Sequence, residues 1–102
     1  GMILTGRRVM AAEGYKLGFV TEVVREGEAL AGAQRWAEQI LECSPVSIRT
    51  SKDVVMRGDE YASVREAFEA DYQSVKDMQN SLDFIEGPLA FSEKRPPDWK
   101  GR

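Results

Sequence analysis

The chain has 102 residues, of which 42% are hydrophobic and 30% charged, with a formal net charge of −3 at pH 7. These values are typical of a single small globular domain spanning residues 1–102. The slight negative charge argues against nucleic acid or an anionic membrane as a partner. Because no apolar run is long enough for a membrane span and no signal peptide is visible, we expect a cytoplasmic protein.

Two features of the composition restrict the available chemistry. The chain contains no His, which removes the usual general base and the commonest metal ligand, so no metal site is expected. Its single Cys, Cys43, cannot form an intrachain disulfide. Because Cys43 follows the apolar residues Ile40 and Leu41, we expect it to be a buried or half-buried side chain.

The first quarter of the chain predicts short elements. The apolar residues 2–4 end at Thr5-Gly6, which suits a helix C-terminus. A short helix is expected at 11–17, closed by Gly18 in the left-handed conformation. Residues 19–24 are rich in β-branched side chains and read as a strand or as an extended segment. A strand there has no second strand in the chain to pair with.

Residues 26–42 form the clearest predicted helix, since apolar residues recur at spacings of three and four along it: Leu30, Ala33, Ala37, Ile40 and Leu41. Ser44-Pro45 then offers an N-cap followed by Pro at the first helical position. The next helix is expected at 46–57, and Gly58 ends it.

Ser63 and Glu66 have the spacing of a capping box, in which Ser caps a helix and Glu lies three residues further on. We expect this helix to begin at Ser63 or earlier, at Asp59, and to continue to Asn80. One face of it is formed by Val64, Phe68, Tyr72, Val75 and either Met78 or Gln79.

A last pair of helices is predicted after Ser81, a plausible N-cap with Asp83 in the first turn. Gly87-Pro88 interrupts the first of them, because Pro lacks the backbone N–H. Pro88 then opens a second short segment that carries Lys94 and Arg95 in its last turn.

Pro96-Pro97 stops this segment, and Trp99 is expected to act as an aromatic anchor. The predicted fold is therefore all-α, a small bundle of four to five helices with one short extended segment.

Two charged groups are weak candidates for a site. The basic side Arg49, Lys52 and Arg57 of one predicted helix could face a phosphate, but a solvated helix face is the better interpretation. Glu66, Glu69 and Asp71 lack a predicted pocket that would separate their pKa values, so we expect no catalytic role for them.

Two stretches resemble a known family. Residues 81–99 read S-x-D-F-x-E-G-P-x-A-F-x-E-K-R-P-P-x-W, and residues 4–24 carry L-T-G, A-A-E, L-G-F-V and E-V-V in that order. Both are similar to the C-terminal part of enoyl-CoA hydratase/isomerase proteins, the crotonase superfamily, with Gly14 where the family usually has Ala. The resemblance covers essentially the whole chain.

The resemblance implies the helical C-terminal domain of an enzyme that adds water to a 2-enoyl-CoA, or carries out a related isomerisation, in fatty acid metabolism. In the family a β-rich N-terminal core supplies the oxyanion hole and the catalytic glutamates. That core is not recognisable here, and Gly1-Met2 looks like the scar of a cleaved tag. We therefore expect a segment of a longer enzyme that has no catalytic residue and is catalytically silent alone.

The same resemblance assigns one site residue and one mode of assembly. The lysine of the family's E-K-R tail reaches the phosphate end of coenzyme A, which makes Lys94 the expected CoA-binding residue. CoA is then part of the substrate, and no separate cofactor is expected. The family forms trimers or dimers of trimers, so a homo-oligomer is expected. The alternative is a free-standing helical oligomerisation or interaction module without a role in acyl-CoA chemistry.

Overall fold

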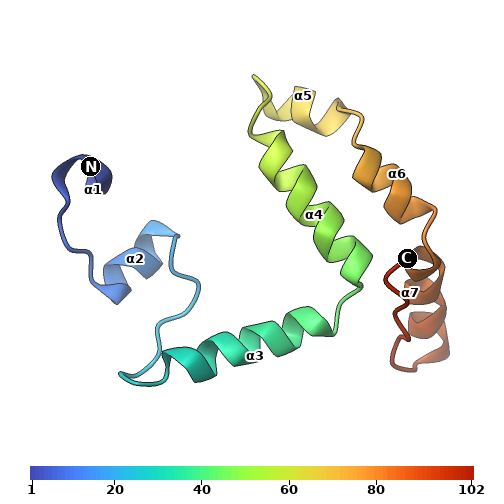
Figure 1. Cartoon of the computed structure of the whole chain (residues 1–102), viewed down its shortest axis with the longest axis horizontal. Coiled ribbons are helices and arrows are strands. Elements are labelled where there is room, and N and C mark those ends of the chain that lie inside the picture. Colours follow the sequence, from blue (N-terminus) through green and yellow to red (C-terminus); the bar gives the residue numbers. More distant parts are fainter. The chain divides into compact units, whose positions relative to one another are not determined.

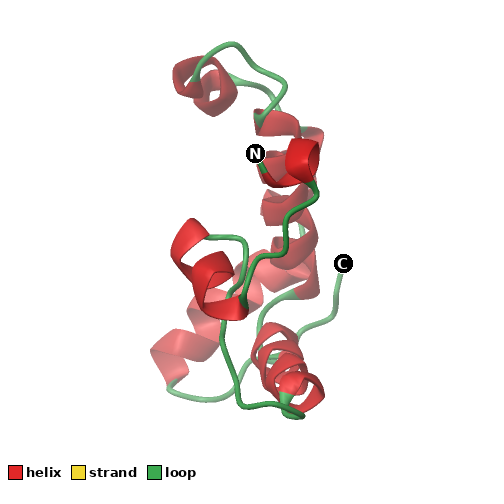
Figure 2. Cartoon of the chain, turned by 90° about the vertical axis from the view of Figure 1, so that its left-hand side faces the viewer, coloured by secondary structure: helices red, strands yellow, loops and turns green.

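The computed structural model describes residues 1–102 and contains seven helices and no strand (Figure 1, Figure 2). The helices are α1 (Met2–Thr5), α2 (Ala11–Leu17), α3 (Ala29–Leu41), α4 (Pro45–Gly58), α5 (Val64–Glu69), α6 (Gln73–Gln79) and α7 (Leu82–Glu93). The all-α prediction is confirmed, although the chain forms more and shorter helices than the four to five expected. None of them is long and apolar enough to span a lipid bilayer.

Capping residues set the helix boundaries largely as the sequence predicts. The Ser44 hydroxyl accepts a hydrogen bond from the Ser47 amide at the start of α4, with Pro45 following in the first turn. At the C-termini of α1 and α2, Gly6 and Gly18 adopt left-handed conformations with φ of 61° and 87°. Such conformations cost Gly little, so each helix stops where the predicted Gly stands.

Contacts divide the chain into two compact units, and the first comprises Gly1–Ala37. Within it the Phe19 and Val20 amides donate to the Gly14 carbonyl, which brings both side chains against the Gly14 Cα. A Cβ on Gly14 would lie 2.7 Å from Val20 Cγ2. Gly at this position therefore allows the closest approach of α2 and the segment that follows it.

Residues 19–25 form an irregular segment, so the strand alternative is wrong. No neighbouring strand accepts its backbone hydrogen bonds, and side-chain contacts hold it instead. Glu22 accepts from Arg35 Nη2 at 2.7 Å and from Trp36 Nε1 at 2.9 Å. These two bonds attach the segment to α3.

The second unit, Glu38–Arg102, is built on the packing of α4 against α5 and α6 (Figure 1). The Thr50 hydroxyl donates to the Ser74 carbonyl at 3.1 Å, and the Ser74 hydroxyl donates to Asp53 at 2.6 Å. Tyr72 is buried beside these contacts, with its hydroxyl donating to the Ala67 carbonyl at 2.9 Å. These hydrogen bonds at Ser74 thus fix the position of α6 relative to α4.

The single helix expected from Ser63 to Asn80 is wrong, because the chain leaves the helical conformation between α5 and α6. Ser63 caps α5 as predicted, by accepting from the Glu66 amide. Ala70 then has φ −67° and ψ 149°, an extended conformation. The break turns the Tyr72 side chain into the unit, and its burial offsets the backbone hydrogen bonds lost at the break.

The predicted interruption at Gly87-Pro88 is also wrong, since α7 continues through Pro88 to Glu93. Pro removes one intrahelical hydrogen bond, a cost that the surrounding contacts must exceed. α7 is attached at its beginning through the Ser81 cap and at its end through Arg95, which bonds back to Glu86. Contacts at both ends therefore keep the helix in one piece.

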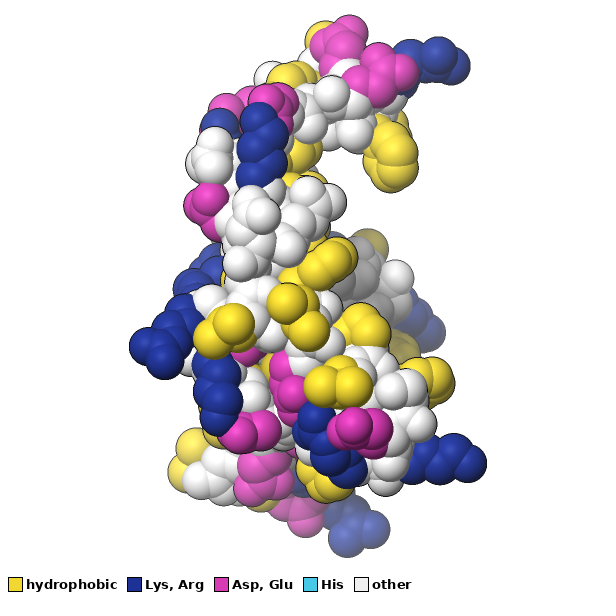
Figure 3. Space-filling model, turned by 90° about the vertical axis from the view of Figure 1, so that its right-hand side faces the viewer, with side chains coloured by type: hydrophobic (Ala, Val, Ile, Leu, Met, Phe, Trp, Pro, Cys, Tyr) yellow, Lys and Arg dark blue, Asp and Glu magenta, His cyan; other side chains and the backbone are white.

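Most apolar side chains remain exposed. Only three hydrophobic residues are buried, namely Val46, Tyr72 and Ala90. Phe68 is 90% exposed and Phe91 is 87% exposed, and Figure 3 shows hydrophobic side chains standing between charged ones on one face. Contiguous apolar surface is rare on monomers, and it normally marks a surface that contacts another chain or domain.

We predict that the 102-residue chain self-associates at micromolar concentration, because association removes exposed apolar surface that the short chain cannot bury by itself. Sedimentation equilibrium measures the mass directly. A well-folded species at the monomer mass of 11.4 kDa would contradict this expectation.

Candidate functional site

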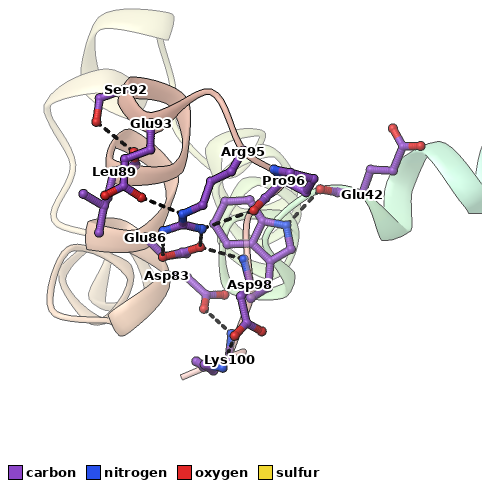
Figure 4. Close-up of polar contacts among 11 residues, drawn as sticks. Glu42, Asp83, Glu86, Leu89, Ser92, Glu93, Arg95, Pro96, Asp98 and Lys100 are labelled. Carbon is purple, nitrogen blue, oxygen red and sulfur yellow. Dashed lines mark hydrogen bonds and ion pairs between the residues drawn. The ribbon is translucent and has the colours of Figure 1, made fainter.

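Asp83, in the first turn of α7, joins three segments of the second unit, and Figure 4 shows its contact with Lys100. Its side chain is only 3% exposed. One carboxylate oxygen accepts from the Ser44 hydroxyl at 2.8 Å, and the other accepts from the backbone amides of Lys100 at 2.7 Å and Gly101 at 3.1 Å. Burial alone would raise the pKa of Asp83, but these hydrogen bonds outweigh it and hold the pKa below its usual value.

The residues after Lys94 return along α7 as the C-terminal tail, residues 95–102. Trp99 Nε1 donates to the Glu42 carbonyl at 2.8 Å, beside the start of α4. The Trp99 ring also lies against Gly87, where a Cβ would be 3.3 Å from a ring carbon. Leu82 donates its amide to the Arg102 carbonyl at 2.8 Å. The expected role of Trp99 as an anchor is confirmed by these contacts.

Arg95 is the centre of an ion-pair cluster with Glu86 and Glu93, the Arg95 cluster (Figure 4). Its two terminal nitrogens donate to the two oxygens of Glu86 at 2.6 and 3.0 Å, a bidentate pair. Its Nε donates to Glu93 at 2.6 Å. Glu86 also accepts from the Asp98 amide at 2.6 Å, so the cluster holds α7 and the tail together.

Electrostatics within the Arg95 cluster favour the charged forms of Glu86 and Arg95. The Arg95 guanidinium and the Asp98 amide lower the pKa of Glu86 from its ordinary 4.5 to about 2. In turn Glu86 and Glu93 raise the pKa of Arg95 above its ordinary value. The positive charge of Arg95 is thus matched by two adjacent carboxylates.

Lys94 lies at the C-cap of α7, between the two charged partners Glu93 and Arg95. Its φ is 53°, and it is the only residue other than Gly with a positive φ. The Lys94 ammonium is exposed and forms none of the ion pairs of the chain. The sequence placed Lys94 in the last helical turn, whereas the structure places it just beyond, in the left-handed cap.

The other sequence candidates are not brought into this region as a group. Arg49 donates to the Gly101 carbonyl at 3.0 Å, while Arg57 pairs with Asp53 at 3.7 Å. Lys52 is exposed. The basic side of α4 is therefore divided between a contact to the tail, a pair on its own helix and a solvated side chain.

Glu66, Glu69 and Asp71 are exposed, and Asp71 pairs with Lys76. Cys43 is exposed, so the prediction of a buried or half-buried thiol is wrong; the residue lies in the turn between α3 and α4, where its thiol donates to the Gln39 carbonyl at 3.6 Å. The chain contains no group of three or more side chains suited to bind a metal ion.

A surface hollow of about 510 Å³ adjoins the tail, lined by Leu41, Glu42, Pro96, Pro97 and Trp99. It is mostly apolar and lies on one side of the segment that follows Lys94 and Arg95. The roles of Asp83, Glu86 and Arg95 in building this region were not foreseen from the sequence. The spacing of Asp83 and Glu86, three residues apart on one helix face, is the signal that could have suggested them.

Comparisons with known proteins agree with this arrangement of helices and tail. The sequence profile of the enoyl-CoA hydratase/isomerase family matches residues 1–102. A carnitinyl-CoA dehydratase from Escherichia coli O157:H7 is 38% identical over 99% of this chain, and one from Salmonella typhi is 36% identical. The chain spans about 40% of the length of these relatives.

Two solved structures have the same fold over nearly the whole chain. An enoyl-CoA hydratase/isomerase from Mycobacterium paratuberculosis matches with a TM-score of 0.87 and 28% identity, over 96% of this chain and 38% of its own. An enoyl-CoA hydratase from Bacillus anthracis matches with a TM-score of 0.85 and 31% identity, over 98% of this chain and 38% of its own. The all-helical chain thus has the fold of a helical part of crotonase-type proteins. It belongs to the enoyl-CoA hydratase/isomerase family.

We predict that acid detaches the tail between about pH 4.5 and pH 2. Because the pKa of Glu86 is lowered from 4.5 to about 2 in the folded chain, its stabilising contribution is complete above pH 4.5 and is lost as the pH falls through 2. Asp83 contributes in the same direction. Trp99 fluorescence, recorded in a Trp36→Phe variant that leaves one of the two tryptophans, reports the change.

The matched control is Glu86→Gln in the same background. It lacks the titrating carboxylate, so its Trp99 signal should already be altered at pH 7 and should vary less in this acid range. A tail transition centred near neutral pH, or one unaffected by Glu86→Gln, would contradict the assignment of Glu86.

Proposed function

We propose that the chain is the helical CoA-binding part of an acyl-CoA enzyme, one that hydrates a 2-enoyl-CoA or catalyses a related isomerisation. In this proposal Lys94 contacts the phosphate end of coenzyme A. The observation that carries the assignment is the left-handed conformation of Lys94, with its exposed and unpaired ammonium.

The backbone of Lys94 supports a functional role. A residue with a Cβ in the left-handed region costs about 1–2 kcal/mol relative to the right-handed region, and Gly or Asn normally occupies such a cap. The other left-handed positions of the chain are all Gly. Lys at this one position is unfavourable for the cap, so a benefit outside the fold is the natural explanation.

Charge distribution distinguishes Lys94 from its neighbour. The guanidinium of Arg95 is already bonded to Glu86 and Glu93, whereas the ammonium of Lys94 is free. A free, flexible ammonium is well suited to phosphate oxygens, since charge-assisted hydrogen bonds are among the stronger polar contacts. Of the two cations in the E-K-R motif, Lys94 is therefore the one available to a ligand.

The names of the relatives support the substrate class. They are carnitinyl-CoA dehydratases and enoyl-CoA hydratases, and each of these names specifies a thioester of CoA as the substrate. In the proposed enzyme the oxyanion donors and catalytic carboxylates come from the portion that the relatives have beyond the matched 40%. The helices of this chain would cover the active site, complete the CoA pocket and contribute contacts between subunits.

A second candidate function rests on the exposed apolar side chains. Val64 and Phe68 on α5 are 86% and 90% exposed, which also suits a free-standing helical module that binds another protein. The gene decides between the two, because the enzyme proposal requires an in-frame catalytic core before Met2. An uninterrupted coding sequence of that kind supports the enzyme, and a stop codon there supports the module.

We predict that Lys94→Ala raises KM for CoA substrates about ten- to a hundredfold while kcat changes little, in the parent enzyme that joins these residues to a catalytic core. A phosphate contact far from the reacting carbon stabilises ground state and transition state alike. Such a contact contributes about 1.5–3 kcal/mol. Steady-state kinetics with crotonyl-CoA measure both constants.

Two variants sharpen this test. Lys94→Gly also removes the ammonium but relieves the left-handed backbone, so it should raise KM like Lys94→Ala while increasing stability by up to about 1 kcal/mol. Lys52→Ala removes an exposed cation on α4 and should leave KM unchanged. An unchanged KM in both Lys94 variants would show that Lys94 is a solvated surface residue without a CoA contact. A raised KM in Lys52→Ala would instead favour the basic side of α4 as the phosphate-binding surface.

We also predict that the 102-residue chain alone does not hydrate crotonyl-CoA. The chain lacks His, and its exposed carboxylates Glu66, Glu69 and Asp71 lie outside any cluster that could pair an acid with a base. Loss of absorbance of the enoyl thioester is the assay. Turnover that follows the purified chain through a second chromatographic step would contradict this prediction.

A further inference from the structure

The chain segment around Lys94 is fixed by side chains on both sides of it. Glu93 precedes Lys94 and Arg95 follows it, and these two residues are joined to each other by the 2.6 Å bond from Arg95 Nε. The Lys94 amide donates to the Phe91 carbonyl at 3.3 Å, and the Arg95 amide donates to the Ala90 carbonyl at 3.1 Å. Lys94 thus lies inside a short closed loop of bonds.

The loop is in turn attached to the body of α7. The bidentate bond from Arg95 to Glu86 spans nine residues and reaches back two turns along the helix. Glu86 is 17% exposed in its side chain and also holds the Asp98 amide. A planar guanidinium with two parallel bonds permits little rotation, so the direction of the chain on leaving Lys94 is set by Glu86.

From this geometry we infer that Arg95 is a positioning residue for Lys94: through Glu86 and Glu93 it holds Lys94 in the left-handed conformation that presents the ammonium to a phosphate group. The inference rests on the proposed function of Lys94. It assigns different roles to the two adjacent cations, since Arg95 has its charge matched within the protein and acts through its neighbour.

Alternative roles for Arg95 agree less well with the contacts. A direct phosphate contact would require Arg95 to give up bonds to two carboxylates, both of which would then repel the phosphate. A purely structural role, holding the tail against α7, overlaps with that of Asp83 and Trp99, which attach the tail independently. Beside the two backbone bonds of the cap, the Arg95 side chain is the one that ties the residues next to Lys94 to the body of α7.

A double-mutant cycle in the parent enzyme tests the inference. Arg95→Ala should raise KM for CoA substrates by about the same factor as Lys94→Ala, about tenfold or more, with kcat little changed. The double variant should be no worse than Lys94→Ala alone, because Arg95 acts through Lys94. Arg95→Lys should not restore KM, since an ammonium cannot form the bidentate pair.

Lys100→Ala is the matched control, because the Lys100 side chain pairs only with Asp98 while its backbone amide still reaches Asp83. It removes a tail cation without removing any hydrogen bond of the Arg95 cluster and should leave KM unchanged. Effects of Arg95→Ala and Lys94→Ala that multiply in the double variant would overturn the inference, and so would an unchanged KM in Arg95→Ala.

Hydrogen exchange separates this inference from the proposed function. In Arg95→Ala the backbone amides at positions 94 and 95 should exchange about tenfold faster or more, while the amides held by Asp83 stay protected. Unchanged exchange overturns the positioning role whatever the kinetics show. Faster exchange together with an unchanged KM in Lys94→Ala overturns the proposed CoA contact instead.

Discussion

The second unit depends on one buried carboxylate. Asp83 binds the cap of α4 through Ser44 and the tail through two successive amides, so a single buried side chain on α7 joins both segments to this helix. An ionised carboxylate with little solvent contact is tolerated only when its oxygens are well supplied with donors. Loss of that side chain would leave several buried donors unsatisfied, at about 1–3 kcal/mol each.

The Arg95 cluster is located where the tail attached by Asp83 runs beside α7. Asp83 and Trp99 hold the tail along α7, where Glu86 accepts from both Arg95 and the Asp98 amide. The result is one free ammonium at a defined place, next to a cation that is fully paired. The helices supply a scaffold, and the tail places the paired guanidinium of Arg95 directly beside the unpaired ammonium of Lys94.

Local signals explain which parts of the fold were predictable. Ser44, Ser63 and Ser81 act as caps in the structure as in the sequence, because capping involves bonds within a few residues. Where the predicted helix boundaries were wrong, tertiary contacts outweigh the local helix propensity. Tyr72 breaks a helix by turning inward, and contacts at both ends of α7 carry it through Pro88. The bond from Arg95 back to Glu86 spans nine positions and begins beyond the end of α7, so no helical spacing predicts it.

The bonds that close the second unit join residues far apart in the sequence, and this determines when the unit can form. Ser44 meets Asp83 across 39 positions, and the Glu42 carbonyl meets Trp99 across 57. Contacts of such long range form late in folding, because closing the intervening loop costs conformational entropy before the contact contributes any favourable free energy. During synthesis, α4 can pack on α5 and α6 as soon as these have been made, whereas the contacts of α4 and α7 with the tail form only after Trp99 and Gly101 have been added. Until then, the surface of α7 that the tail covers is exposed to the cellular environment.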